Sequence, residues 1–357
     1  MQKQILTTPQ GEAYPICTGS GLIGALGGLI AEEAAPPRRV MIVTDSNVAP
    51  LYLAQAEKSL ADAGFSVSTH TVHAGEESKS VAAFGELLEA MCEAHLTRTD
   101  LALALGGGVV GDLTGFASGC YLRGIRFAQC PTTLLAAVDA SVGGKTAINL
   151  RHGKNLAGVF HQPIGVYCDT DTLRTLTRQT VADGAAEAIK TGILGDARLF
   201  AIYETGDPAA QFEEIIARSV ACKAKIVSED PTEKGVRKLL NLGHTAAHAI
   251  EILSDFSVSH GHAVAIGTAI VTRAAAKRGG MDNDEAARIL YTLKRAGLPI
   301  ECPYSSAEMA EIAALDKKAA GSSITVILPE KIGQCRMETI PIGALGTLFE
   351  DGRERTP

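Results

Sequence analysis

Residues 101–116 read LALALGGGVVGDLTGF, in which a short apolar run is followed directly by a glycine-rich turn. Gly106 to Gly111 satisfies the pattern G-x-G-x-x-G, and a helix is predicted to follow from Asp112. Glycines at such a turn let the backbone approach a pyrophosphate, whose charge is favoured at a helix N-terminus. The pattern alone is weak, because a tight strand-to-helix turn without any ligand has the same sequence.

Around this stretch, short apolar runs alternate with helical patterns through the first half of the chain. Such alternation predicts a parallel sheet covered by helices. Strands are predicted near 38–45, 65–72, 101–105, 125–133 and 164–168, and helices over 49–63 and 79–95.

The second half has a different pattern, because segments rich in Ala, Glu, Lys and Leu replace the strand signals after residue 175. The chain of 357 residues also exceeds the roughly 250–300 residues at which one hydrophobic core stops growing. We therefore expect two domains, a Rossmann-like α/β domain over 1–175 and a mostly α-helical domain over 176–357. Helices are predicted over 181–204, 209–228, 241–254, 262–278, 283–296 and 306–315, and a late hairpin over 323–329 and 333–340.

Composition narrows the possible partners and compartment. The net charge of -7 comes from interspersed acidic residues, and no run of Lys and Arg offers a nucleic-acid stripe. No apolar run reaches about 18 residues without a charge or break, and the N-terminus lacks the pattern of a signal peptide. The eight cysteines are scattered, which is typical of reduced thiols. We expect a cytoplasmic protein without nucleic-acid or membrane partners.

Polar side chains near the ends of the predicted strands are candidates for nucleotide binding. Asp45 and Asn47 follow the strand that ends VMIVTD, at the edge where ligands bind in open α/β sheets. Their alternative role is to cap the next helix. Glu76 and Lys79, in GEESK, could hydrogen-bond a ribose from one side of a helix start, or belong to a capped, solvated helix.

The second half contains a group of metal-competent side chains, Glu187, His244, His248, His260 and His262. His244 and His248 are spaced i and i+4, so they share one helix face. One carboxylate and two imidazoles suit a catalytic divalent ion, most naturally zinc, which can polarise an alcohol or carbonyl oxygen. The spacing leaves open which two histidines ligate, and histidines on such a face can also be purely structural.

Charged and polar residues also gather in the glycine-rich segment between these two groups. They are Arg123, Asp139, Lys145, Lys154 and Asn155. Lys and Arg supply charge-assisted donors to phosphate and carboxylate oxygens. The segment therefore suits a polyanionic substrate, and scattered surface cations are the alternative.

Together these motifs resemble the 3-dehydroquinate synthase family, in order and spacing, from about residue 40 to 340. The segments are GGGVVGDLTGF, YLRGIRFAQCPTTLLAAVDASVGGKTAIN, GKNLAGVFHQP, AEAIKTGIL, KLLNLGHTAAHAIE and SHGHAVAIG. The resemblance implies a dehydroquinate synthase-like fold with an NAD-binding domain, a helical metal-binding domain and an active site between them. It also implies one divalent metal, Zn or Co, a small phosphorylated substrate, and a homodimer.

The resemblance assigns roles to individual positions. It implies Glu187, His244 and His260 as metal ligands, with His248 handling protons or supporting the ligands. Matching substrate or catalytic positions are Arg123, Asp139, Lys145, Lys154, Asn155, Lys190, Lys223, Glu233, Arg237, Asn241 and one lysine of the Lys317–Lys318 pair, taken as Lys318. Matching NAD positions are Asp45, Asn47, Glu76, Lys79, Gly107, Gly108, Asp112, Thr132, Thr133, Lys145, Lys154 and Thr175.

The family chemistry would convert 3-deoxy-D-arabino-heptulosonate 7-phosphate to 3-dehydroquinate and phosphate, in the shikimate pathway to aromatic amino acids. It proceeds by transient oxidation by NAD, loss of phosphate, reduction, ring opening and aldol closure. The alternative is a sibling cyclase acting on sedoheptulose 7-phosphate, but Arg237, Asn241 and His248 suit a substrate carboxylate. Two positions depart from the family pattern: His262 replaces the glutamate of H-G-E, and Thr177 replaces a proline.

Overall fold

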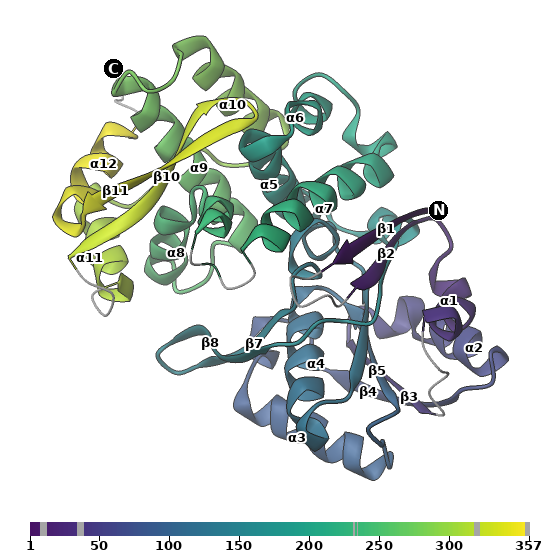
Figure 1. Ribbon diagram of the computed structural model, residues 1–357. Helices are drawn as coiled ribbons and strands as arrows, with labels where there is room; N and C mark the ends of the chain where they lie inside the picture. The colour runs from purple at the N-terminus through teal and green to yellow at the C-terminus, as the bar shows by residue number, and fades with distance from the viewer. Residues whose placement is uncertain (8–12, 34–38, 231–232, 234, 318–321, 354–357) are drawn as a thin grey trace. The chain divides into compact units, whose positions relative to one another are not determined.

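The computed structural model describes residues 1–7, 13–33, 39–230, 233, 235–317 and 322–353. The chain forms two compact units, Met1–Leu176 and Thr177–Pro357 (Figure 1).

The first unit is built on a seven-stranded sheet in the order β1-β2-β9-β6-β5-β3-β4. All neighbouring strands are parallel except β1, which runs antiparallel to β2. The strands are β1 (Gln2–Thr7), β2 (Ala13–Gly19), β3 (Arg39–Asp45), β4 (Ser66–Val72), β5 (Leu101–Gly106), β6 (Arg126–Pro131) and β9 (Val166–Asp169). The mostly parallel sheet confirms the predicted α/β class.

Helices cover both faces of this sheet (Figure 1). On one face α1 (Leu26–Glu33) and α2 (Ala54–Asp62) bury apolar side chains against β3 and β5. On the other face α3 (Val81–Glu93) and α4 (Gly108–Cys120) pack against the alternate side chains of the same strands. Because these strands are buried on both faces, they appear in the sequence as continuous apolar runs.

The sequence did not predict several strands of the first unit. The segment 145–160 was expected to be loop-like but forms an antiparallel hairpin of β7 (Lys145–Leu150) and β8 (Gly153–Phe160). β1 and β2 were also missed. Helix α4 begins at Gly108, not at Asp112, so the glycines themselves form its first turn. The hairpin is largely exposed and contains Gly153 and Gly158, so it lacks the apolar run that marks the buried strands, and its pairing depends on the backbone.

The second unit is mostly helical, as predicted. The segment expected as one helix over 181–204 forms two, because Asp196 ends α5 and caps α6 through the amides of Arg198 and Leu199. The helices are α5 (Arg178–Gly195), α6 (Ala197–Glu204), α7 (Phe212–Glu229), α8 (His244–Leu253), α9 (His260–Lys277), α10 (Asn283–Arg295), α11 (Ser306–Lys317) and α12 (Leu345–Asp351). The late hairpin is confirmed as β10 (Ser323–Lys331) and β11 (Gln334–Pro341).

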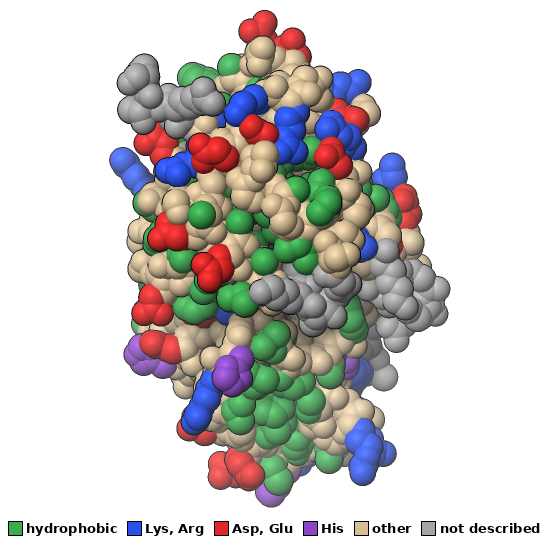
Figure 2. Space-filling model, turned by 90° about the vertical axis from the view of Figure 1, so that its left-hand side faces the viewer, with side chains coloured by type: hydrophobic (Ala, Val, Ile, Leu, Met, Phe, Trp, Pro, Cys, Tyr) green, Lys and Arg blue, Asp and Glu red, His purple; other side chains and the backbone are tan. Residues whose placement is uncertain are grey.

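The distribution of surface charge and the hydropathy of the helices both agree with the sequence. On the face seen in Figure 2, acidic and basic side chains are interspersed rather than gathered in one basic stripe. Among the described residues, no helix is both long and apolar enough to cross a membrane.

Candidate functional site

The glycine-rich turn places a helix N-terminus at the end of β5. Gly107 is the N-cap of α4 and Gly108 its first residue. A methyl group on Gly111 would lie 2.7 Å from the Gln129 side chain on β6, so this glycine permits close packing of the helix on the sheet. The first backbone amides of a helix have no partner within it and favour an anion. Gly107 and Gly108 therefore lie at a helix N-terminus, where an anionic group is favoured.

The order of the strands identifies the edge at which a ligand would bind. The chain leaves β3 for β4 on one side and returns to β5 on the other side, with α2 and α3 on opposite faces. Such a reversal is where open α/β sheets bind ligands, beyond the carboxyl ends of the strands. Asp45 ends β3 and Gly106 ends β5, so both lie beside the reversal.

Four predicted nucleotide residues lie at this carboxyl edge. Asp45 caps its own turn, since its Oδ1 accepts hydrogen bonds from the amides of Asn47, at 2.8 Å, and Val48, at 3.0 Å. Thr133 Oγ1 accepts from a backbone amide one turn later. The Thr132 hydroxyl is buried and has no hydrogen-bond partner among the described residues. A buried hydroxyl without a partner is costly, and a ligand at this edge would satisfy it.

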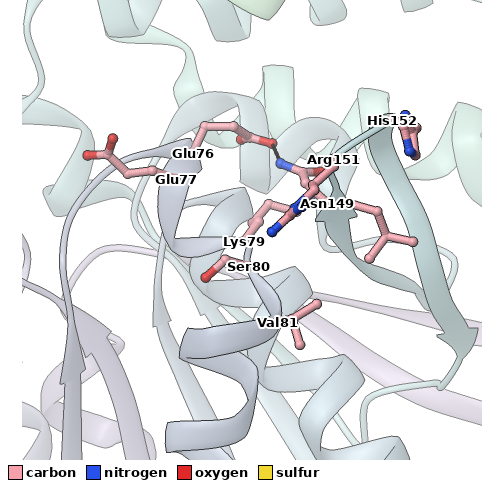
Figure 3. Close-up of a pocket in the computed structure, with 9 residues that line it drawn as sticks. Glu76, Glu77, Lys79, Ser80, Val81, Asn149, Arg151 and His152 are labelled. Atoms are coloured by element: carbon pink, nitrogen blue, oxygen red, sulfur yellow. Dashed lines mark hydrogen bonds between the residues drawn. The ribbon is translucent and has the colours of Figure 1, made fainter.

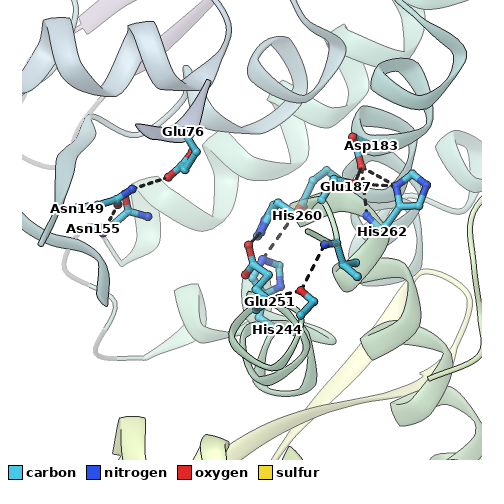
Figure 4. Close-up of polar contacts among 12 residues, drawn as sticks. Glu76, Asn149, Asn155, Asp183, Glu187, His244, Glu251, His260 and His262 are labelled. Carbon is cyan, nitrogen blue, oxygen red and sulfur yellow. Dashed lines mark hydrogen bonds and ion pairs between the residues drawn. The ribbon is translucent and has the colours of Figure 1, made fainter. Parts of the chain in front are cut away.

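A hydrogen-bond network joins the predicted nucleotide residues to the hairpin (Figure 4). Lys79 is 5% exposed, and its Nζ lies 2.6 Å from Asp112 Oδ2 and 2.5 Å from Asn155 Oδ1. Asn149 Nδ2 donates to Glu76 Oε1 at 2.8 Å, while Asn149 Oδ1 accepts from the Asn155 amide at 2.9 Å. The structure therefore links Glu76 and Lys79 to a predicted substrate residue, Asn155.

This network borders a pocket of about 600 Å³ between the start of α3 and the hairpin (Figure 3). Glu76 and Asn149 meet there, whereas Glu77 points away from the other labelled side chains. The lining residues are Glu76, Glu77, Lys79, Ser80, Val81, Asn149, Leu150, Arg151 and His152.

The other predicted residues of the first unit are more dispersed. Lys145 and Lys154 lie on the hairpin, and Asp139 lies in the π-helical turn Ala136–Ala140. Thr175 Oγ1 lies 2.7 Å from the Tyr52 hydroxyl. Arg123 is exposed beyond the C-terminal end of α4, at the opposite edge of the sheet from Gly107. The first unit thus does not bring Arg123 together with the nucleotide residues.

Positive backbone φ angles occur at three of the predicted site residues. They are 66° at Arg123, 56° at Asn155 and 59° at Glu233. Residues other than glycine adopt this region at a cost, and such residues cluster at functional sites.

In the second unit, Glu187, His244 and His260 offer ligand atoms within 4.8 Å of one another. The Glu187 Oε1 atom lies 3.6 Å from His244 Nε2 and 3.3 Å from His260 Nε2. Donors held tetrahedrally at about 2.0–2.2 Å from a zinc ion lie roughly 3.3–3.6 Å apart. The Glu187 carboxylate is buried, and ion pairs with Lys190, His244 and His260 take the place of well-aligned hydrogen bonds. These residues therefore fit a divalent ion.

Contacts on the far side of each imidazole support this assignment. The His244 Nδ1 atom lies 3.1 Å from the Leu242 carbonyl oxygen, which leaves Nε2 to face Glu187. The His260 Nδ1 atom lies 3.5 Å from Glu251 Oε1 (Figure 4). Metal-binding histidines usually donate their second ring N–H to such carbonyls and carboxylates.

The pKa values of all three residues in this cluster are shifted by burial and by neighbouring charges. Burial favours the neutral form of Glu187, but the Lys190 ammonium, 2.5 Å from its Oε2, and both histidines lower the pKa of the carboxyl well below its usual range. Burial and the Lys190 charge lower the pKa of His244 to about 3, so its imidazole is neutral. For His260, burial is outweighed by hydrogen bonds to Glu187 and Glu251, which raise its pKa to about 10.

Predicted cationic residues of the second unit are buried, which is unusual for such side chains. Lys190 and Arg237 are each 2% exposed, and Lys223 is 8% exposed. Asn241 Nδ2 donates to Glu233 Oε1 at 2.7 Å, so the structure brings these two predicted residues together. Lys318 lies outside the described residues.

The remaining histidines have different surroundings. The exposed His248 ring meets His244 edge-on, with 5.7 Å between the ring centroids, and is not part of the three-residue cluster. His262 Nδ1 donates to Asp183 Oδ1 at 2.7 Å. Thr177, which departs from the family pattern, is the N-cap of α5 and accepts from the Thr180 amide.

Sequence reasoning missed Asp183, Glu251 and Asn149. Glu251 had a signal, because it follows His244 and His248 at i+7 and i+3 on one face of an otherwise apolar helix. Asp183 had a weaker one, since it precedes Glu187 by four residues. Asn149 had none, because it lies in a hairpin that was not predicted, and its partners are Asn155 of that hairpin and Glu76, which is 73 residues away in the chain.

Comparison with known proteins identifies the relatives of this chain. A family model described as 3-dehydroquinate synthase N-terminal matches residues 69–183, and one described as 3-dehydroquinate synthase C-terminal matches residues 184–319. A 3-dehydroquinate synthase of Symbiobacterium thermophilum is 41% identical over 90% of this chain and 93% of its own length. Another, from Rhodopseudomonas palustris, is 44% identical over 90% of this chain and 88% of its own.

Solved structures agree at the level of the fold. The 2-epi-5-epi-valiolone synthase of Streptomyces hygroscopicus, solved with NAD+ and Zn2+, has a TM-score of 0.86 and 27% identity, covering 95% of this chain and 96% of its own. A 2-deoxy-scyllo-inosose synthase, solved with carbaglucose-6-phosphate, NAD+ and Co2+, has a TM-score of 0.88 at 23% identity, covering 98% and 100%. Matches to both halves by family models and relatives above 40% identity lead to one conclusion: the chain belongs to the 3-dehydroquinate synthase family.

Proposed function

We propose that this protein converts 3-deoxy-D-arabino-heptulosonate 7-phosphate to 3-dehydroquinate and phosphate, as a carbon-oxygen lyase of the shikimate pathway. The observation that carries the proposal is the Glu187, His244 and His260 cluster, with separations suited to zinc, in a chain of this family. NAD and one divalent ion, Zn or Co, are the proposed cofactors, in line with the NAD+ and the Co2+ or Zn2+ bound in the two solved structures described above.

In this proposal, the first unit binds NAD and the second unit binds the metal. Gly107, Gly108 and Thr132 would bind NAD at the carboxyl edge of the first unit. Glu187, His244 and His260 would hold the metal in the second unit. Bound NAD supplies hydride transfer, and a bound divalent ion supplies Lewis acidity toward a substrate oxygen. The proposed domain boundary lies at 175/176.

Residues around the metal cluster would handle the anionic substrate. Lys190 keeps the Glu187 carboxylate ionised, since its Nζ lies 2.5 Å away. Lys223 and Arg237, both buried, carry charge that suits phosphate and carboxylate groups. Asn241, held by Glu233, would orient a substrate hydroxyl.

In the first unit, Asn155 would present its Nδ2 as a donor, because Lys79 already engages its Oδ1. His248, which is exposed beside His244, would hold or move a proton.

The alternative is a sibling cyclase that acts on sedoheptulose 7-phosphate. The 3-dehydroquinate synthases of two bacteria are 41% and 44% identical to this chain, whereas the valiolone synthase is 27% identical. Buried Arg237 also supports a substrate that carries a carboxylate, because guanidinium groups bind carboxylates in a bidentate manner. Both observations favour the heptulosonate.

The experiment follows inorganic phosphate release from each sugar phosphate, with NAD and Zn2+ or Co2+ present. We expect one phosphate and one dehydroquinate per heptulosonate, no net NADH, and no release from sedoheptulose 7-phosphate. Glu187→Gln should abolish release, whereas Glu311→Gln, on the exposed surface of α11, should not change it. Release from sedoheptulose 7-phosphate alone would contradict the proposed substrate.

We further propose that the protein is a cytoplasmic homodimer. Its mass in solution, measured by light scattering after gel filtration, should be twice the chain mass of 37.2 kDa. A single-chain mass at micromolar concentration would contradict the dimer.

A further inference from the structure

A short group of polar side chains joins the two helices that carry Glu187 and His260 (Figure 4). Asp183 lies on α5, four residues before Glu187, so both project from one face of that helix. Its Oδ1 atom accepts hydrogen bonds from Ser259 Oγ at 2.5 Å, from His262 Nδ1 at 2.7 Å and from the His262 amide at 3.2 Å. All three donors belong to the start of α9, next to His260.

This arrangement replaces the usual cap of a helix. Ser259 is the N-cap of α9, but its side chain makes no capping hydrogen bond. The carboxylate of Asp183 serves this purpose from another helix, accepting from an amide of the first turn. Its negative charge also suits the N-terminal end of a helix dipole.

The backbones of the two helices touch at the same place. A methyl group on Gly261 would lie 2.4 Å from both the Cα and the carbonyl oxygen of Asp183. Such closeness admits only glycine, and it fixes the start of α9 against α5. His260 is one residue from Gly261, and Glu187 is about one helical turn from Asp183. The contact between Gly261 and Asp183 therefore lies beside the metal ligands, whose Oε1 and Nε2 atoms are 3.3 Å apart.

His262 is turned toward Asp183 by the same contacts. Ser259 Oγ and Asp183 Oδ1 both approach Nδ1 of the His262 ring, at 2.9 Å and 2.7 Å. A hydrolytic Ser-His-Asp triad uses opposite ring nitrogens for its serine and aspartate, so this group is not one. A glutamate at position 262, as in the family pattern, would instead place a second carboxylate beside Asp183.

We propose that Asp183 and His262 are positioning residues that hold α9 against α5 and thereby set the distance between the metal ligands Glu187 and His260. This inference rests on the metal centre of the proposed function. It accounts for the histidine in His-Gly-His, because an imidazole donates to Asp183 where a carboxylate would repel it.

The test measures Co2+ affinity by competition with a chromophoric chelator, together with the visible absorption spectrum of bound Co2+. Asp183→Ala should weaken binding about 10–100-fold, as loss of groups that orient metal ligands does, and should change the spectrum. Asp282→Ala is the matched control. Asp282 caps α10 through the amides of Asp284 and Glu285, so its loss costs similar helix stability without touching the cluster.

The outcomes separate the inference from the function on which it rests. Failure of the unmodified protein to bind Co2+ would overturn the metal centre and this inference together. Normal binding by the unmodified protein, with Asp183→Ala within two-fold of it or Asp282→Ala equally impaired, would overturn the inference alone.

A second pair of variants covers the case in which Asp183→Ala does not fold. His262→Glu should weaken Co2+ binding, and adding Asp183→Asn in that background should restore part of the lost affinity by removing the facing charge. If the second substitution weakens binding further, Asp183 and His262 do not act as a pair.

Discussion

Gly267 on α9 is the residue whose enlargement should most directly displace a metal ligand. A methyl group there would lie 2.1 Å from the carbonyl oxygen of Gly243, the residue immediately before His244. Ordinary contact begins near 3.4 Å, so Gly267→Ala should move the start of α8 by about 1.3 Å. Metal sites tolerate deviations of about 0.2 Å, and we therefore expect Co2+ affinity to fall at least ten-fold.

The same substitution should lower stability by an amount that can be estimated. Overpacking at a contact this close costs about 3 kcal/mol, and replacing glycine by alanine within a helix returns about 1 kcal/mol. A net loss of about 2 kcal/mol corresponds to a decrease in Tm of roughly 4–8 °C for a unit of this size.

Calorimetry of the metal-free protein and chelator competition for Co2+ would measure the two effects of Gly267→Ala. Gly346→Ala on α12 is the control, because its methyl group would lie at an ordinary 3.7 Å from Ala310 Cβ. That variant should match the unmodified protein in Co2+ affinity and should be equally stable or up to about 1 kcal/mol more stable, since it makes no close contact. If Gly267→Ala also matches it, the close contact of α8 and α9 does not position His244.

Three further predictions concern stability and cofactor binding. Burial alone would raise the pKa of Asp100, but hydrogen bonds from Thr97 and the Arg39 amide hold it below its ordinary value of 3.8. Ionised Asp100 therefore stabilises the folded protein above about pH 3.8, and this stabilisation is lost as pH falls through the pKa of the folded state. The decrease in Tm caused by Asp100→Asn should accordingly become smaller below about pH 3.8. A decrease that stays constant from pH 7 to pH 3 would contradict this. Asn149→Ala removes two solvent-exposed hydrogen bonds, including that to Glu76, and should cost about 1 kcal/mol in urea denaturation and weaken NAD binding; unchanged NAD affinity would separate this network from the nucleotide. Saturating Zn2+ at about 1,000 times its Kd should stabilise the unmodified protein by about 4 kcal/mol, reversibly with chelator, and a Tm independent of zinc would argue against the metal centre.

Local patterns in the sequence were sufficient for most of the fold. LALAL became β5, because a strand buried on both faces must be apolar throughout. The helices of the second unit followed from their periodicity, with Asp196 dividing one predicted helix into two. The hairpin over 145–160 could not be predicted in the same way, since its strands are held by pairing across the turn and not by an apolar pattern.

The candidate site, like the fold, was predicted only in part from the sequence. Sequence reasoning on residue types found the five metal-competent side chains, and the resemblance selected Glu187, His244 and His260 from them. The structure brings these three together and turns His262 toward Asp183. No local pattern could show that contact, because it requires two helices to approach until only glycine fits at position 261.

The sequence by itself determined the fold class, the family and the residue types available for chemistry, because periodicity and motif spacing are properties of short segments. The tertiary structure decided which of these residues meet and which carboxylates, such as Glu251 and Asp183, orient them. The physical reason is that a hydrogen bond or a metal ligand set depends on separations of a few ångströms between segments far apart in the chain. Those separations are set by the packing of whole helices and strands.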